Sequence, residues 1–119
     1  MPLYRRNKRD TNEPDLIDAA HAYAGVVCDR APSGAGYDLN VFDAVAGVLY
    51  LVEVKVPGCE NHFTKRERAF IRLCLAAKVP YHVWVRDRDV QLVIESGRGV
   101  GRDGTPVRSP TVFERLEKL

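Results

Sequence analysis

The sequence has no hydrophobic run long enough to cross a membrane. Its longest apolar stretch, around Val48 to Val52, is far shorter than the roughly 20 residues that a bilayer requires. The basic first ten residues are not followed by an apolar segment. We therefore expect no secretory signal, no membrane partner and a cytoplasmic location.

Cysteine and histidine are also scarce. The three cysteines are odd in number and far apart, and no CxxC motif occurs, which argues against a disulfide framework. The three histidines lack the spacing of zinc ligands. Any metal site should therefore use oxygen ligands, which favours Mg²⁺ or Mn²⁺.

The composition that remains is that of an ordinary globular domain. The chain has 119 residues, of which 45% are hydrophobic and 29% charged, with a net charge of only +2. The cations are clustered, as expected for phosphate contacts, in three sets: Arg5, Arg6, Lys8 and Arg9; Lys65, Arg66, Arg68 and Arg72; and, more loosely, Arg98, Arg102 and Arg108. Solvated surface charge is the alternative explanation for each set.

Hydrophobic periodicity and turn residues predict the order of elements. Three segments have the pattern of helices, at 12–24, 64–78 and 111–119. Five have the pattern of strands, at 26–28, 37–42, 48–56, 81–85 and 90–94, with hairpin turns at 43–47 and 86–89. Residues 1–10 are expected to form a basic arm, and 96–109 a mobile loop within a domain spanning 11–119. This order predicts an α/β (α+β) sheet with helices packed against it.

The first two helices each have a candidate cap and an apolar stripe. Asn12 or Thr11 is expected to cap the first helix, whose core face is Leu16, Ile17, Ala20 and Tyr23. Thr64 is expected to open the second helix, whose core face is Phe70, Leu73, Cys74 and Ala77.

The strand at 48–56 contains the chemical anomaly of the chain. Alternation places Leu49, Leu51, Glu53 and Lys55 on one face and only apolar side chains on the other. Burying an unpaired charge costs several kcal/mol. Glu53 and Lys55 must therefore lie beside groups that compensate their charges, or face solvent. An exposed edge strand is the ordinary alternative.

Asp38 is a candidate partner for Glu53. If residues 43–47 form a hairpin turn, Asp38 lies opposite residues 52–54. Two carboxylates so close together repel each other unless a cation lies between them, and a hard divalent ion satisfies that need. Lys55 would then lie beside the ion, where it could assist a water or stabilise charge on a phosphate.

At this point the sequence resembles a known family, the PD-(D/E)xK nucleases, and among them the small VRR-NUC type found in phage and bacteria. The resemblance covers roughly residues 5–86. It rests on four segments: Lys8 to Glu13, Ser33 to Leu39, Leu51 to Lys55, and Phe63 to Phe70. It implies a restriction-endonuclease-like mixed sheet and a bacterial or phage-infected cell.

The resemblance also implies roles for individual residues. Asp38, Glu53 and the Val54 carbonyl would bind the metal, Lys55 would be the catalytic lysine, and Glu13 would complete the site. Glu13 is equally explained as a first-turn acid that favours the helix dipole. Two positions depart from the family pattern: Tyr37 replaces the usual proline, and Glu67 stands where a glutamine is common. Glu67 also fits a capping box with Thr64, so it is a secondary candidate.

The function expected is hydrolysis of DNA phosphodiesters with Mg²⁺ or Mn²⁺, either as a nicking enzyme or on branched or junction DNA. The basic arm and the helix containing Lys65, Arg66 and Arg68 would bind the DNA backbone. A homodimer is plausible, because cutting two strands requires two sites. The alternatives are a nucleic-acid-binding module of the same fold that does not cleave, and a structural protein.

Overall fold

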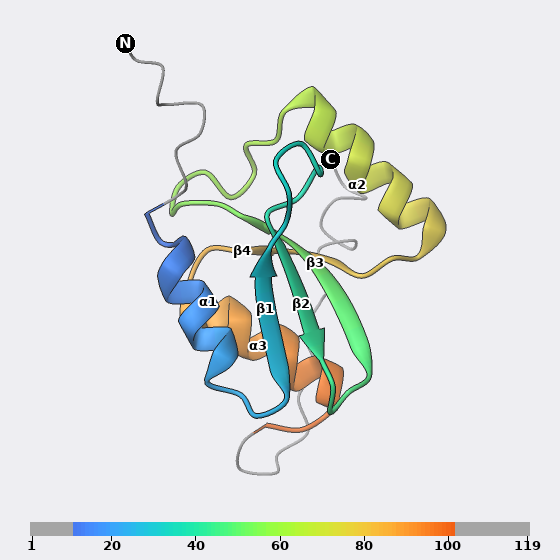
Figure 1. The fold of residues 1–119 in the computed structure, drawn as a ribbon. Coiled ribbons are helices and arrows are strands. Elements are labelled where there is room, and N and C mark those ends of the chain that lie inside the picture. The colour runs from blue at the N-terminus through green and yellow to red at the C-terminus, as the bar shows by residue number, and fades with distance from the viewer. Residues whose placement is uncertain (1–10, 102–119) are drawn as a thin grey trace.

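The computed structural model describes residues 11–101 (Figure 1). In chain order the elements are α1 (Glu13–His21), β1 (Val26–Arg30), β2 (Leu39–Asp43), β3 (Val48–Val54), α2 (Lys65–Ala77), β4 (Tyr81–Trp84) and α3 (Asp87–Arg98). The expected arm at 1–10, the helix at 111–119 and most of the loop at 96–109 lie outside the described residues. Among the helices of the described part, none is long and apolar enough to cross a membrane.

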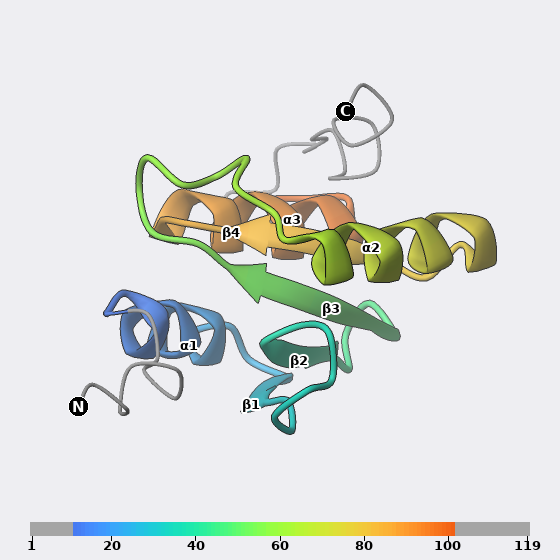
Figure 2. The ribbon, with the colours of Figure 1, turned by 90° about the horizontal axis from the view of Figure 1, so that it is seen from above.

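The four strands form one mixed sheet in the order β1-β2-β3-β4. The first three are antiparallel neighbours, whereas β4 runs parallel to β3 after the α2 crossover. Helices α1 and α2 lie on opposite sides of the sheet when the molecule is seen from above (Figure 2). The expectation of an α/β (α+β) sheet flanked by helices is confirmed.

Each side of the sheet has its own apolar cluster. On one side, α1 and α3 pack on the alternating residues of the strands, among them Leu39, Val52 and Trp84. On the other side, α2 packs on Tyr81, Val83 and Val85. The expected core face of α1 is confirmed, because Leu16, Ala20 and Tyr23 are buried and Ile17 is partly buried.

The β2–β3 hairpin forms as predicted, and a buried ion pair holds its turn. Asp43, which is fully buried, faces Val48 across the hairpin, and one carboxylate oxygen accepts from the N–H groups of Val45 and Ala46. Arg98 of α3 contacts both oxygens of Asp43, at 2.9 and 3.1 Å. Burial alone would raise the pKa of Asp43, but these hydrogen bonds hold it below its ordinary value.

The expected strand at 90–94 is wrong, because this segment is the middle of α3. Val90, Val93 and Ile94 are buried at helical spacing, i, i+3 and i+4, facing α1 and the sheet. The supposed turn at 86–89 is instead the start of the helix, where Asp89 accepts from the N–H groups of Val85 and Arg86. The helix continues to Arg98, so the expected loop does not begin at residue 96.

The predicted core face of α2 is rotated by part of a turn. Leu73, which was expected in the core, is 67% exposed, and Ala77 is exposed as well. The buried positions are Ile71 and Cys74. These follow Glu67 at i+4 and i+7, so one helix face carries both the apolar contacts and the carboxylate of Glu67.

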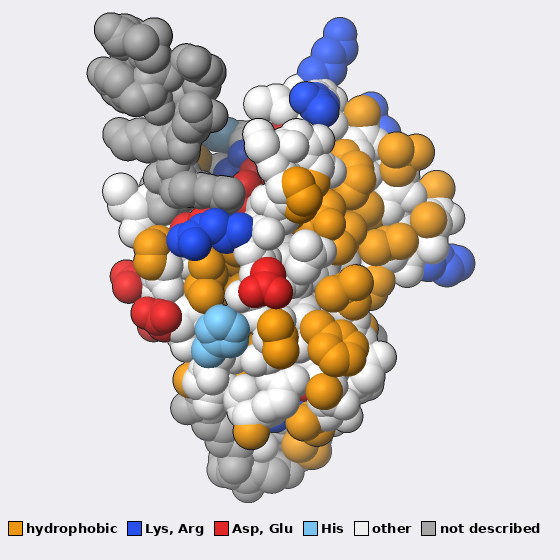
Figure 3. Space-filling view, in the orientation of Figure 1, with side chains coloured by type: hydrophobic (Ala, Val, Ile, Leu, Met, Phe, Trp, Pro, Cys, Tyr) orange, Lys and Arg blue, Asp and Glu red, His pale blue; other side chains and the backbone are white. Residues whose placement is uncertain are grey.

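Helix α2 covers only part of its side of the sheet. Val27, Phe42 and Leu49 stand in one row across β1, β2 and β3, because the register pairs the first with the second and the second with the third. Each is about half exposed. Hydrophobic side chains gather on this side of the molecule in Figure 3.

The ion pair of Asp43 should contribute strongly to stability. Replacing Asp43 with Asn leaves the partly buried Arg98 guanidinium without its counter-charge, so we expect the free energy of unfolding to fall by about 3 kcal/mol in urea denaturation. The control is Asp29→Asn, an exposed aspartate on the neighbouring strand, which should change stability by less than about 0.5 kcal/mol. Equal losses in the two variants would contradict this assignment.

Candidate active site

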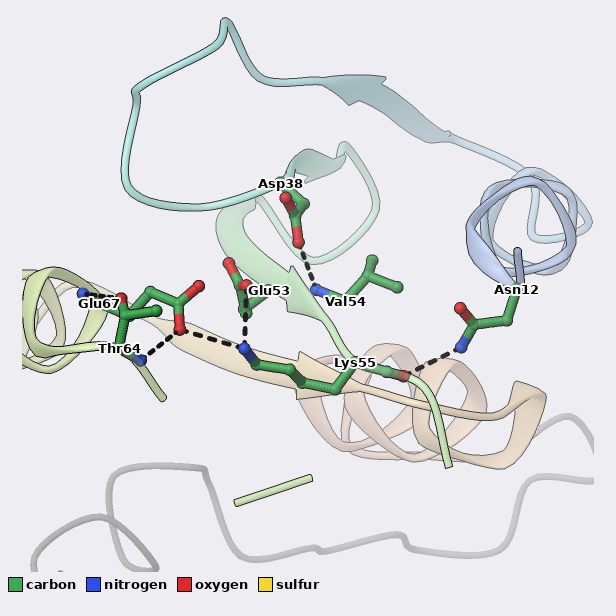
Figure 4. Close-up of polar contacts among 7 residues, drawn as sticks. All are labelled: Asn12, Asp38, Glu53, Val54, Lys55, Thr64 and Glu67. Atoms are coloured by element: carbon green, nitrogen blue, oxygen red, sulfur yellow. Dashed lines mark hydrogen bonds and ion pairs between the residues drawn. The ribbon is translucent and has the colours of Figure 1, made fainter. Parts of the chain in front are cut away.

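Asp38 and Glu53 lie opposite each other at the open end of the hairpin. The paired register ends with Leu39 opposite Val52, and Asp38 and Glu53 are the next residues on the two segments. The Asp38 N–H donates to the Val52 carbonyl at 2.9 Å, which keeps Asp38 beside the end of β3, and Asp38 and Glu53 line the same cavity. Figure 4 shows the two carboxylates on the same side of the end of β3. The predicted proximity of Asp38 to Glu53 is thus what the hairpin produces.

The Asp38 carboxylate is held against the backbone of β3. Its Oδ2 accepts from the N–H of Val54 at 2.8 Å. Because the N–H and C=O of a strand residue point to the same edge, the Val54 carbonyl is directed toward the same side of β3 as Asp38. Asp38, Glu53 and Val54 therefore bring oxygen atoms from two strands to one place.

The loop that precedes Asp38 packs closely on α2. Gly36 has φ of +95°, and a Cβ there would lie 2.9 Å from the ring of Phe70. Tyr37 stacks on the same ring, with centroids 5.7 Å apart. Position 36 requires glycine because φ is positive there and because a Cβ would clash with Phe70. The close packing of the loop on α2 fixes the path of the chain into Asp38.

Glu53 is buried, with only 6% of its surface exposed, and its charge is poorly compensated. Burial, followed by the nearby charges of Asp38 and Glu67, raises its pKa to about 9, and a hydrogen bond to Glu67 adds to the effect. Lys55 opposes this shift from 3.5 Å but does not cancel it. At neutral pH Glu53 therefore keeps its proton unless a cation enters.

Lys55 is held at both its backbone and its side chain. Its N–H donates to the Trp84 carbonyl, and its carbonyl accepts from the Asn12 amide at 3.0 Å. Its Nζ donates to Glu67 at 3.1 Å and lies 5.1 Å from the ring centre of Phe63. The ammonium group therefore has a fixed position beside the carboxylates (Figure 4).

Glu67 is both a helix cap and a member of this cluster. Its Oε1 accepts from the Thr64 N–H at 2.9 Å, while its own N–H donates to the Thr64 hydroxyl, which completes the expected capping box. The same oxygen accepts from Lys55. Partial burial raises the pKa of Glu67, but the hydrogen bonds from Thr64, Glu53 and Lys55 bring it below its ordinary value. The two sequence interpretations are therefore compatible.

Asn12 has a different role from the one expected. It occupies the N-cap position of α1, but its side chain makes no capping bond. Its amide instead donates to the carbonyls of Lys55 and Val85, at 3.0 and 2.8 Å. Asn12 thus ties the start of α1 to the ends of β3 and β4, beside the lysine.

The cluster lines a cavity of about 320 Å³ that is open to solvent. Three of its lining residues were not candidates from the sequence: Val56, Cys59 and His62. Their only sequence signal is their place in the short segment between β3 and α2. All three cysteines of the chain are free.

Glu13, the expected fourth member of the site, forms an ion pair with a residue of β1. It is buried at the start of α1, and its Oε1 accepts from Arg30 of β1 at 2.7 Å. It is not among the residues that line the cavity. Of the expected DNA-binding residues, Arg5, Arg6, Lys8 and Arg9 lie outside the described part, whereas Lys65, Arg66 and Arg68 lie in the first turn of α2.

The residues present fit a hard divalent cation with water ligands. Within residues 11–101, no three or more histidine, cysteine, aspartate or glutamate side chains form a group that could hold a metal on their own. Mg²⁺, however, commonly binds through one or two carboxylates and keeps several waters. Asp38 and Glu53, with the Val54 carbonyl beside them, match that ligand set.

Comparison of the chain with protein-family models, curated proteins and solved structures gives no match. The site is therefore interpreted from its own geometry and chemistry.

Replacing Glu53 with Gln should stabilise the protein in the absence of metal. Between pH 4.5 and about 9, Glu53 is protonated in the folded chain and ionised in the unfolded chain, so the stability of the wild type falls as pH rises. We expect Glu53→Gln to gain on the order of 2 kcal/mol at pH 8 and little at pH 5 in urea denaturation with EDTA.

The matched control is Glu60→Gln, at a glutamate on the surface beside Arg86. It should give no such gain in stability. A gain for Glu53→Gln that is the same at pH 5 and pH 8 would show that the burial of a charge is not its cause.

Proposed function

We propose that this protein is a Mg²⁺- or Mn²⁺-dependent endonuclease that hydrolyses DNA phosphodiester bonds. The single observation that carries the proposal is that Asp38, Glu53 and Lys55 line one open cavity, with the Lys55 ammonium 3.5 Å from Glu53. A carboxylate pair with a fixed lysine suits hydrolysis of a phosphate ester, because negative charge increases in the transition state.

The metal ligands in this proposal are the carboxylates of Asp38 and Glu53 and the carbonyl of Val54. When bound, the ion would supply Lewis acidity toward the phosphate and lower the pKa of a water. The protein supplies the alignment. Asp38 is kept in place by the Val54 N–H, and Glu53 is held by its strand and by Lys55.

Lys55 has the second role. Its backbone bonds to Trp84 and Asn12 fix the strand end, and its bond to Glu67 aims the ammonium into the cavity. From there it can donate to a phosphate oxygen or orient the attacking water.

The DNA backbone would approach over α2. Lys65, Arg68 and Arg72 are spaced at i, i+3 and i+7, which places them on one side of the helix. That side is turned away from the helix face of Glu67, Ile71 and Cys74, so the stripe belongs to the outer surface of α2 and not to the lining of the cavity. Because a single cavity accounts for one cut, a homodimer would be needed to cut both strands or a junction.

Variants of the central residues test the chemistry. We expect Glu53→Gln and Lys55→Met each to lower the cleavage rate of branched, nicked or linear DNA at least about 100-fold with Mg²⁺. Glu60→Gln, outside the cavity, should cleave like the wild type. Undiminished cleavage by Glu53→Gln would exclude the mechanism. DNA binding by the wild type that is insensitive to Mg²⁺, without any cleavage, would favour a binding module.

The basic stripe of α2 gives a second prediction. Removing one phosphate contact by Arg72→Ala should weaken DNA binding and make the slope of log K against log salt less steep by about one. Leu73→Ala is the control, because Leu73 is the next residue and is also exposed but uncharged. An unchanged slope for Arg72→Ala, measured by fluorescence anisotropy between 50 and 200 mM salt, would remove this helix from the DNA interface.

A further inference from the structure

A buried hydroxyl lies beside the carboxylate cluster without a partner. The side chain of Tyr81 is fully buried, and its hydroxyl has no hydrogen-bond partner among residues 11–101. Burying a polar group without a hydrogen bond is unfavourable, and most buried polar groups in native proteins have a partner. The unpartnered Tyr81 hydroxyl therefore indicates a functional role.

The sheet register directs Tyr81 toward the site. Tyr81 pairs with Leu51, and two residues later Val83 pairs with Glu53, so both side chains of β4 lie on the α2 side of the sheet, as Glu53 does. The Tyr81 ring packs on Phe70, which follows Glu67 by three residues on α2. Tyr81 thus lies on the same side of the sheet as Glu53 and packs against the helix that carries Glu67.

The electrostatic environment of the hydroxyl agrees with this placement. Burial raises the pKa of Tyr81, and the next largest causes are Glu53, Glu67 and Asp38, in that order. These are the three carboxylates of the cluster. The phenol is therefore a neutral O–H donor at any physiological pH, next to groups that are acceptors when ionised.

Glu53 is held in the structure by two charged neighbours. Its carboxyl group is hydrogen-bonded to Glu67 and lies 3.5 Å from the Lys55 ammonium, which also contacts Glu67. A divalent cation bound by Glu53 would compete with the contact to Lys55, because the ion and the ammonium are both positively charged. A neutral O–H donor does not repel the ion, so it can hold the carboxylate in place beside it.

We propose that Tyr81 is a positioning residue of the site, whose hydroxyl donates a hydrogen bond to the Glu53 carboxylate when that carboxylate binds a metal ion. This inference rests on the proposed metal site and assigns Tyr81 to metal affinity and ligand orientation, with no contact to the substrate.

The test is a comparison of Tyr81→Phe with Tyr23→Phe. Tyr81→Phe removes the hydroxyl alone, so we expect Mn²⁺ and Mg²⁺ to bind about tenfold more weakly in isothermal titration calorimetry of the full chain. Its melting temperature in EDTA should be unchanged or higher, because no bond is lost in the metal-free state. Tyr23→Phe loses a 2.8 Å bond to Glu95 on the opposite side of the sheet, and should melt lower with unchanged metal affinity.

The outcomes separate this inference from the proposed function. Wild-type metal affinity in Tyr81→Phe, with normal binding by the wild type, would overturn the role of Tyr81 and leave the nuclease proposal standing. A melting temperature of Tyr81→Phe in EDTA lowered as much as that of Tyr23→Phe would also overturn it, since the hydroxyl would then serve folding. Absence of Mn²⁺ and Mg²⁺ binding by the wild type would overturn both proposals.

Discussion

The register of the β2–β3 hairpin is the constraint on which the rest of the site depends. A slip of one residue would turn every side chain of a strand to the other face, and would separate Asp38 from Glu53. The register is fixed at the turn by Asp43 and its bonds to Val45 and Ala46, and by the apolar residues that must face α1 and α3. A buried ion pair at one end of the hairpin thus determines which side chains meet at the other.

The charges of the cluster are arranged at a cost to stability. Glu53 is held among other carboxylates with one lysine for compensation, and the fold accepts a protonated acid instead of a better-packed apolar side chain. The opposite face of β3 carries no charged side chain. There Tyr50, Val52 and Val54 are buried in an apolar cluster. Such local instability is common where a protein must bind a charged ligand, because the groups are arranged for the bound state.

Several parts of the structure follow from local pattern alone. The hairpin at 43–47, the capping box of Thr64 and Glu67 and the shared face of Glu53 and Lys55 each depend on residues close in sequence. The segment 90–94 was misassigned because a short run of apolar residues fits a strand or a helix equally well, and the packing of α3 on α1 and the sheet decides it.

Other features depend on contacts between distant segments, which no local pattern contains. The exposure of Leu73 is set by how α2 must turn to bring Glu67 to Lys55. Asn12 bonds to residues 43 and 73 positions away, and the burial of Tyr81 follows from the parallel pairing of β4 with β3. Glu13 illustrates the same limit, because its partner Arg30 is brought to it only by the packing of α1 on the sheet.

The double role of Glu67 restricts how the sequence can change at this position. One oxygen atom accepts from both the N–H that begins α2 and the ammonium of Lys55. A substitution at this position is therefore pleiotropic, because it alters helix initiation and the lysine together. Glutamine retains an acceptor for the N–H and removes the charge, so it is the conservative replacement. Selection at position 67 would thus act on folding and on chemistry through one atom. Fewer amino acids should therefore be accepted at position 67 than at either neighbouring position.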